Sequence, residues 1–196
     1  VLAGPTGSAR EIAVATPLGD DAVVLVEMRG EEHLSRPFEF ELTVLSEDRA
    51  IDPDTLLGEN LTVRLAVHGD GDPRYFNGFV TQVAQLPETS GRHALYRLSV
   101  RPWLWFLTQT ADCRIFQEST VPDIVKEVIR GHGFSDLEDR LQGTYRTWEY
   151  CVQYRETDFN FVSRLLEQEG IYYYFLHENG AHKLVLADAP AASPSR

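Results

Sequence analysis

The segment from Tyr150 to Phe175 constrains the fold most, because it reads as a strand, a helix and a strand in one run. Thr157 carries the hydroxyl of an N-cap residue, and Asp158 places a negative charge at the positive end of the helix. Gly170 then ends the helix, since glycine adopts the left-handed conformation without steric cost. The apolar stripe of this helix is formed by Phe159, Phe161, Val162, Leu165 and Leu166. The segment therefore predicts a region that contains both helix and strand.

The composition is that of an ordinary soluble globular protein, with 43% hydrophobic and 24% charged residues. A chain of 196 residues can form one large or two small domains. No apolar run is long enough to span a bilayer, and no charged segment followed by an apolar stretch opens the chain. We therefore expect no direct membrane insertion and no N-terminal signal peptide.

The charge of the chain is strongly acidic, with 18 basic and 30 acidic side chains and a formal net charge of -12. Such a charge repels polyanions unless a local basic patch intervenes, and the sequence contains no such patch. We therefore expect no nucleic acid among the partners.

The first half of the chain shows the alternating pattern of β-strands. Hydrophobic and polar residues alternate over 38–44, 61–67 and 96–100, as they do in strands with one buried face. Residues 23–26 are apolar on both faces, which predicts a central strand. Several short strands with turns between them indicate a small barrel or a sandwich, and the pattern alone does not choose between the two.

Glycine and proline mark the connections between these strands. The clusters at 69–73 and 87–91 predict turns, and Gly78 inside the strand 74–85 predicts a bulge or a sharp bend. Asp52 followed by a proline predicts the start of a short helix. Its buried side would be formed by Leu56 and Leu57.

Pro102 ends the last of these strands because it lacks a backbone donor. The following run, 103–107, is too apolar for exposure, so we expect it to join the first domain to the second. An aromatic cluster can also bind a sugar or a base, but burial in a core is the simpler interpretation. Ser119 or Thr120 would cap a further helix, whose buried stripe is formed by Val121, Ile124, Val125 and Val128. The pattern assigns no element to residues 134–145.

A hairpin is predicted at the C-terminal end, because Asn179-Gly180 between two apolar runs favours a two-residue type I′ turn. In that register His177 faces His182. Two facing histidines can ligate a metal, but no cysteine or carboxylate at ligand spacing accompanies them. We interpret them as a solvated pair near the tip of the hairpin.

Catalytic motifs are missing from the sequence. It contains no nucleophile elbow, no His-Glu-x-x-His motif and no phosphate-binding or dinucleotide fingerprint. Cys113 and Cys151 lie in strand-like apolar surroundings, which favours buried, inert thiols. An arrangement of His132 with Asp136 is the remaining candidate pair. We therefore assign no catalytic, cofactor-binding or metal-binding residue, expect no cofactor, and expect that the chain is not an enzyme.

Several motifs in order along the chain resemble one known family. They are Ser35-Arg36-Pro37-Phe38, Tyr75-Phe76-Asn77-Gly78, Arg101-Pro102-Trp103-Leu104-Trp105, Arg114-Ile115-Phe116-Gln117, the block 150–175 and Leu186-Ala187-Asp188. Together they resemble VgrG, the spike-tip proteins of type VI secretion systems, over residues 13–190. The resemblance implies an α+β, mainly β fold, in which a small tail-hub-like β-barrel precedes an α+β domain.

This resemblance implies a domain division and a function. Residues 1–12 are expected to be disordered or vector-derived, 13–108 to form the barrel domain, 109–190 the α+β domain, and 191–196 a tail. The implied role is structural, at the base of the spike. Two alternatives remain open, a tail hub of a phage or phage-derived particle and an effector hydrolase.

The resemblance also implies partners and a location. These partners are two further copies of the full-length protein, the Hcp tube, and effector, adaptor and PAAR-type tip proteins. The protein would assemble in the bacterial cytoplasm and leave through the type VI apparatus. No β-helical repeat of the family's needle occurs in these 196 residues.

Overall fold

A computed structural model describes residues 11–19, 21–67, 71–87 and 92–190. The chain divides into two compact units. Unit 1 comprises Val1–Glu32, Phe38–Pro102 and His177–His182, and unit 2 comprises His33–Pro37, Trp103–Leu176 and Lys183–Arg196. Two short segments thus belong to a different unit from their sequence neighbours. In the described ranges, no helix has the length and apolar character needed to cross a membrane.

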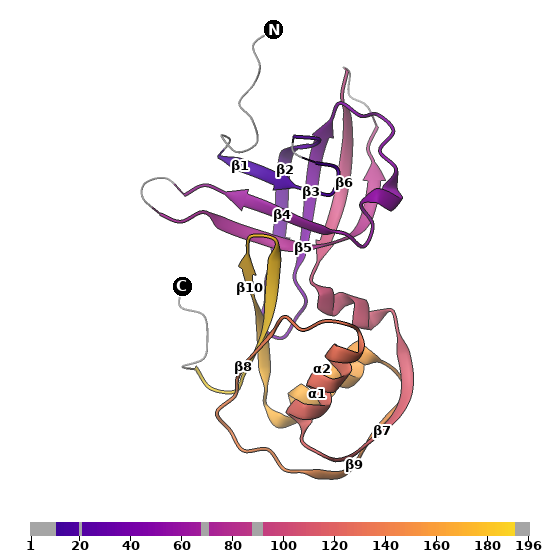
Figure 1. The fold of residues 1–196 in the computed structure, drawn as a ribbon, viewed down its shortest axis with the longest axis vertical. Helices are drawn as coiled ribbons and strands as arrows, with labels where there is room; N and C mark the ends of the chain where they lie inside the picture. Colours follow the sequence, from indigo (N-terminus) through magenta and orange to yellow (C-terminus); the bar gives the residue numbers. More distant parts are fainter. Residues whose placement is uncertain (1–10, 20, 68–70, 88–91, 191–196) are drawn as a thin grey trace. The chain divides into compact units, whose positions relative to one another are not determined.

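Unit 1 is built on a six-stranded antiparallel sheet that curls into a half-barrel (Figure 1). Its strands are β1 (Ile12–Ala15), β2 (Val24–Glu31), β3 (Glu39–Ser46), β4 (Asn60–Leu65), β5 (Arg74–Gln85) and β6 (Ala94–Arg101). They lie in the order β1-β4-β5-β6-β3-β2. The expectation of a mainly β, barrel-like fold is confirmed, and the sandwich alternative is not observed.

The predicted alternation of β3 is present in the structure. Phe38, Phe40, Leu42 and Val44 are almost completely buried, whereas Glu39 and Glu41 are exposed. Leu98 and Val100 of β6 lie opposite Leu42 and Phe40 and are buried with them. The core of unit 1 is therefore formed by the inward positions of neighbouring strands.

The prediction that residues 23–26 form a central strand is wrong, because β2 lies at the edge of the sheet and, within the part of the chain that the structure describes, pairs with β3 alone. The register between these strands shifts between Leu25 and Glu27, which leaves Val26 in a bulge with 58% of its surface exposed. A bulge turns a side chain out of the alternation, so an apolar run no longer requires two covered faces.

The bulge predicted at Gly78 is also misplaced. The register of β5 against β6 shifts between Val80 and Gln82, and Gly78 lies in a regular part of the ladder. A Cβ atom at Gly78 would lie 2.7 Å from Cγ1 of Val100 and 2.9 Å from the carbonyl oxygen of Arg101. Glycine is required here for close packing of neighbouring strands.

The short helix after Asp52 is a single 3₁₀ turn, η2 (Pro53–Thr55), whose first amide is capped by the Asp52 side chain. Leu56 is buried as predicted, but Leu57 is 41% exposed, because a single turn presents only one of two consecutive residues to the core. The turns predicted at 69–73 and 87–91 lie largely outside the described residues.

Unit 2 contains two helices and two small sheets. Its elements are η3 (Trp103–Thr108), β7 (Ala111–Ser119), α1 (Val121–Gly131), β8 (Leu137–Arg140), β9 (Trp148–Thr157), α2 (Asp158–Glu169), β10 (Tyr172–Glu178) and β11 (Ala181–Ala187). Strands β7 and β9 pair antiparallel, and the other sheet has the order β10-β11-β8 (Figure 1). The unassigned segment 134–145 therefore supplies β8, which pairs in parallel with β11.

Both predicted helices are confirmed, including their caps. The hydroxyl of Thr157 accepts the amide N–H of Asn160 at 3.1 Å, and Gly170 ends α2 with a φ of 70°. Thr120 caps α1 in the same way, through the amide of Asp123. These local sequence signals fix the ends of the helices without help from distant parts of the chain.

The aromatic run after Pro102 forms η3, in which Trp103, Leu104 and Leu107 are buried. Trp103 stacks on Phe134 with ring centroids 4.9 Å apart. The indole of Trp103 is therefore a core group of unit 2 and presents no face to a sugar or a base, whereas Trp105 is partly exposed.

Candidate functional site

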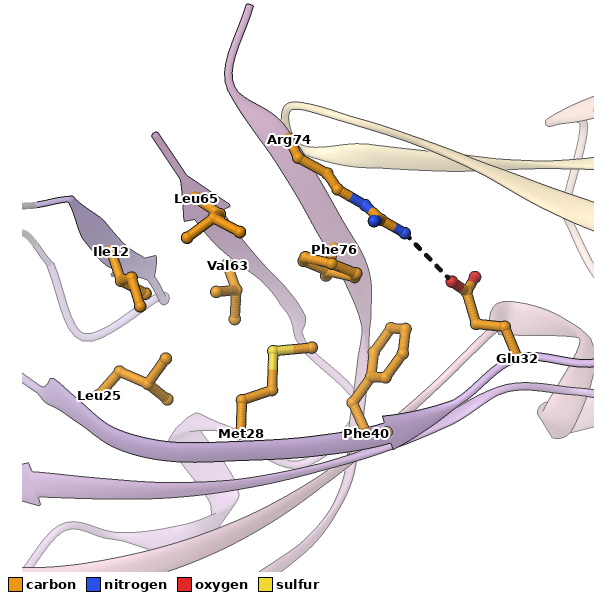
Figure 2. A pocket seen from close by; sticks show the side chains of 10 residues that line it. Ile12, Leu25, Met28, Glu32, Phe40, Val63, Leu65, Arg74 and Phe76 are labelled. Atoms are coloured by element: carbon orange, nitrogen blue, oxygen red, sulfur yellow. Dashed lines mark ion pairs between the residues drawn. The ribbon is translucent and has the colours of Figure 1, made fainter. Parts of the chain in front are cut away.

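A pocket of about 380 Å³ opens on the concave face of the half-barrel in unit 1 (Figure 2). Its lining comes from β1 to β5 and consists of Ile12, Leu25, Met28, Gly30, Glu32, Phe40, Val63, Leu65, Arg74 and Phe76. The lining is apolar apart from Glu32 and Arg74. Pockets of this size and polarity bind apolar side chains or small apolar ligands.

The two charged residues lie together at one end of the pocket (Figure 2). The Arg74 guanidinium is 3.9 Å from a carboxylate oxygen of Glu32, and it also lies over the Phe76 ring at 4.7 Å from the centroid. Gly30 leaves room for Phe40 on the wall, because a Cβ atom at this position would lie 2.2 Å from the ring. The pocket thus has an apolar interior and one charged end.

A second cluster in unit 1 brings together the two histidines of the C-terminal hairpin. The Nδ1 atom of His177 lies 3.0 Å from the amide nitrogen and 3.1 Å from the carbonyl oxygen of Asn77, and its Nε2 atom lies 2.9 Å from a carboxylate oxygen of Glu32. The Nδ1–H of His182 donates to the side-chain oxygen of Asn77 at 2.8 Å. His182 is 2% exposed.

The interpretation of His177 and His182 as a solvated pair is therefore wrong. The two strand ends of the hairpin belong to unit 1, and Phe38 contacts both imidazoles there at centroid distances of 4.8 and 5.5 Å, whereas the turn itself, residues 178–180, is exposed. Burial, together with the nearby His177, lowers the pKa of His182 to about 3. His182 is consequently neutral at physiological pH and acts as a hydrogen-bond donor.

Asn77 connects this cluster to the sheet. Its amide group donates to the side chains of Asn60 and Thr62, both at 2.7 Å, while its oxygen accepts from His182. Asn77 is completely buried, so these bonds compensate for the loss of water. Sequence reasoning gave Asn77 no separate role, although it lies in one of the motifs that carry the family resemblance.

The main polar cluster of unit 2 is centred on Asp158. This buried carboxylate accepts hydrogen bonds from Gln153 at 2.6 Å, from Thr110 at 2.9 Å and from Arg114, and the Nε2 atom of His132 lies 2.7 Å away. The candidate pair His132 with Asp136 is therefore not the one observed, since His132 binds Asp158. The sequence analysis gave Asp158, the first residue of α2, only the role of placing a negative charge at the positive end of the helix.

Burial alone would raise the pKa of Asp158, but the bonds from Gln153, His132 and Thr110 and the charge of Arg114 outweigh it and hold the pKa below 3.8. In a hydrolytic triad the histidine lies between the acid and the nucleophile. Here Thr110 and His132 both bind the same carboxylate, so the histidine does not bridge them. The cluster joins β7, β9, α1 and α2 and has the geometry of a structural ion pair.

A third polar cluster involves Asp188, from the last of the family-like motifs. Its carboxylate accepts the amide N–H groups of Gln142 and Gly143 and the hydroxyl of Tyr145, at 3.0, 2.7 and 2.7 Å. These bonds, Tyr145 first, lower the pKa of Asp188. Asp188 thus fixes the loop that follows β8.

The prediction of buried thiols is confirmed for Cys151 and is wrong for Cys113. Cys151 is buried, and burial raises the pKa of its thiol. Cys113 is exposed, because it lies on the outer face of the β7–β9 ribbon with Ile115, Tyr150, Val152 and Tyr154. Across the described ranges, no group of three His, Cys, Asp or Glu side chains is arranged to hold a metal ion.

Comparison with known proteins gives a consistent result. Residues 31–196 match the family described as phage tail baseplate hub (GPD). Two curated relatives are the type VI secretion system spike proteins VgrG1b and VgrG1c of Pseudomonas aeruginosa, with 52% and 51% identity over 95% of this chain. The chain spans about a quarter of the length of these relatives, 25% of each.

Solved structures agree with this assignment. The Escherichia coli c3393 protein, described as a component of the type VI secretion system with structural similarity to the T4 tail proteins gp27 and gp5, aligns with a TM-score of 0.78. It is 29% identical, and the alignment covers 86% of this chain and 47% of that one. A tail protein of Neisseria meningitidis shares the fold, with a TM-score of 0.63 and 16% identity over 94% of this chain and 52% of that one.

These matches extend over both units and include the residues that build the three polar clusters. They confirm the resemblance to the VgrG spike proteins that the ordered motifs predicted. The chain therefore belongs to the phage tail baseplate hub family.

Proposed function

We propose that this chain is a structural unit at the base of a type VI secretion spike. The observation that carries the proposal is the identity of about half of all residues to VgrG spike proteins along 95% of the chain. The half-barrel of unit 1 supports it, since the E. coli type VI component with 29% identity has the same fold. A phage tail hub is the alternative, but the tail protein of N. meningitidis shares only the fold.

The finer role follows from the family resemblance. In the longer protein, three chains form a ring on the end of the six-fold Hcp tube, and the ring carries the piercing tip with its effector, adaptor and PAAR-type partners. Each chain must then present two barrel-like units, so that three copies occupy six positions. The half-barrel of unit 1, whose last strand ends at Arg101 rather than at the predicted boundary of residue 108, is one such unit, and unit 2 is the α+β domain of the same chain. The protein assembles in the cytoplasm and is exported by the apparatus itself.

A purely mechanical role is supported by the polar clusters. The side chains of Asp158, Asn77 and Asp188 each form hydrogen bonds with neighbouring protein groups. Such bonds are typical of residues that stabilise a fold. The proposal therefore assigns no enzymatic activity and no cofactor to this chain.

Export of the tube protein tests the proposal in a bacterium that carries the gene. Deletion should abolish release of Hcp into the medium, and the intact gene supplied in trans should restore it. An effector enzyme that only rides on the spike gives a different result, because its deletion would leave Hcp release unchanged and remove only the killing of neighbouring cells.

A further inference from the structure

The outer face of the β7–β9 ribbon is uncharged and largely apolar. Its residues are Cys113, Ile115, Gln117 and Ser119 of β7 and Trp148, Tyr150, Val152 and Tyr154 of β9. Four of them are large and between 48% and 67% exposed, namely Ile115, Tyr150, Val152 and Tyr154. Ile115 lies directly opposite Val152 in the register, and the two tyrosines flank Val152 along β9. A contiguous exposed apolar patch of this kind marks an interaction surface.

The inner face of the same ribbon packs against a helix. Phe116 of β7 stacks on Phe161 of α2 with ring centroids 5.5 Å apart, and the helices of unit 2 lie on this side of the ribbon (Figure 1). The 12 residues of α2 make a helix about 18 Å long, and the outer face from Trp148 to Tyr154 spans about 20 Å. A sheet that buries its faces under helices is one of the stable layered arrangements of proteins. The outer face therefore has the length that a helix of three to four turns needs.

Two arginines lie at opposite ends of the outer face. The guanidinium carbon of Arg146 is 3.7 Å from the centroid of the Trp148 ring, and that of Arg155 is 5.2 Å from the centroid of the Tyr154 ring. Each positive charge is thus held beside an aromatic side chain of this face. Neither arginine forms an ion pair with a carboxylate in the part of the chain that the structure describes.

The carboxylates of the ribbon do not neutralise these two charges. Asp112 and Glu156 form ion pairs with other arginines, at 3.4 and 2.7 Å. Glu118 and Glu149 fall between the paired positions of the outer face in the register, so the alternation of the strands assigns them to the other side. The outer face therefore presents an apolar centre between two positive ends.

We infer that the outer face of the β7–β9 ribbon binds an amphipathic helix of a partner protein, with acidic side chains near both of its ends. The apolar stripe of this helix covers the four exposed side chains, and its carboxylates pair with Arg146 and Arg155. Tyrosine, tryptophan and arginine are enriched at the centres of protein interfaces. A second copy that pairs through the same face is disfavoured, because arginine would meet arginine at each end. Single-stranded nucleic acid also stacks on aromatic rings, but the net charge of -12 repels it.

A labelled peptide tests the inference on the intact chain. The probe is fluorescein-labelled Glu-Ala-Gln-Leu-Ala-Gln-Ala-Leu-Ala-Gln-Leu-Ala-Gln-Ala-Leu-Ala-Gln-Glu, whose leucines and terminal glutamates share one helix face. Fluorescence anisotropy measures its binding. A twin peptide with lysine in place of both glutamates keeps the apolar stripe and reverses the charge at both ends. We expect saturable binding of the probe, and binding at least about fivefold weaker for the twin.

Two pairs of variants locate the binding surface. Val152 is 48% exposed at the centre of the outer face, and Val26 is 58% exposed on β2 of unit 1. Val152→Glu should weaken binding of the probe by about tenfold or more, while Val26→Glu should leave it unchanged. Arg155→Glu should reverse the preference, so that the lysine twin binds more tightly than the probe. Arg92→Glu, at an exposed position of unit 1, should keep the original preference. Circular dichroism verifies that each variant is folded.

Three results would overturn the inference. The first is no saturable binding at probe concentrations up to about 1 mM, or binding that Val152→Glu leaves unchanged. The second is equal binding of the probe and its lysine twin, both to the wild type and to Arg155→Glu, which would leave the arginines without a role in recognition. The third is displacement of the labelled probe by a single-stranded oligothymidylate at lower concentrations than by the unlabelled probe, which would make this face a stacking platform for nucleic acid.

Discussion

The imidazole Nδ1 of His182 lies 2.8 Å from the side-chain oxygen of Asn77, although 105 residues separate the two in sequence. This hydrogen bond attaches the tip of the C-terminal hairpin to β5 in the core of unit 1. Because His182 is neutral at physiological pH, the bond brings no buried charge into the core.

Asn77→Leu should destabilise the protein strongly. The change removes the acceptor of His182 and the donor to Thr62 and leaves buried polar groups without partners, which costs about 2 to 4 kcal/mol of unfolding free energy. Chemical denaturation followed by circular dichroism measures it. The control is Asn160→Leu at an exposed position of α2, which should stay within about 0.5 kcal/mol. Equal losses of unfolding free energy in the two variants would show that the hydrogen bonds of Asn77 do not stabilise the protein.

Asp158→Asn should destabilise unit 2 by about 3 kcal/mol at pH 7, because it removes the buried carboxylate of Arg114 and leaves that residue only the more exposed Asp112 as an ion-pair partner. The folded pKa of Asp158 lies below the unfolded value, so its stabilisation is complete above about pH 4 and is lost as the pH falls below that value. The difference in unfolding free energy between the two proteins should therefore become smaller as the pH falls from 7 to 3.

The control for Asp158 is Asp54→Asn, at an exposed position in η2. This change should shift the unfolding free energy by no more than about 0.5 kcal/mol and leave its pH dependence unaltered. A constant difference between wild type and Asp158→Asn at every pH would contradict the role given to the ionised carboxylate.

Gly78→Ala should cost about 1 to 3 kcal/mol, because the added methyl group meets Val100 and the backbone of Arg101 at less than 3 Å. Gly131→Ala in α1 is the matched control, since nothing lies within 4 Å of its Cβ position. That helical change should be neutral or stabilising by up to about 1 kcal/mol. Thermal unfolding of both variants measures the difference, and a tolerated alanine at Gly78 would refute the packing argument.

The isolated 196-residue chain should be mainly monomeric. A ring of three chains that mimics six positions needs two barrel units from each chain, and unit 1 is one half-barrel. Its ring neighbour is then missing from the isolated chain. Light scattering after size exclusion at several concentrations measures the mass. A trimer that persists on dilution would show that these residues carry the oligomerisation surface.

Local signals predicted much of the fold. The caps Thr157 and Gly170 act within one turn of helix, so α2 could be placed to the residue, and the alternation of β3 fixed its buried face. Features that depend on distant partners were missed. The apolar run of β2 gave no sign of its bulge at Val26, because a bulge is defined only against the paired strand.

The candidate sites were predicted less well than the fold. His182 binds Asn77, and Asp158 binds Arg114 and His132. Each of these partners lies far away in sequence from the residue that it binds. The family-like motifs did mark several of these residues, including Asn77, Arg114 and Asp188, but gave no indication of which residue binds which. The pocket between β1 and β2 left no trace in the sequence, since its wall comes from five strands.

Electron microscopy of tube ends tests the structural role most directly. Purified Hcp tubes are mixed with the longer protein that contains this chain, and with a version that carries Asn77→Leu, which should weaken the core of unit 1. The account predicts extra density at one end of the tubes with the wild type and much less with the variant. Tubes with bare ends in both mixtures, or protein bound along their sides, would contradict the proposal that this chain forms the base of a spike.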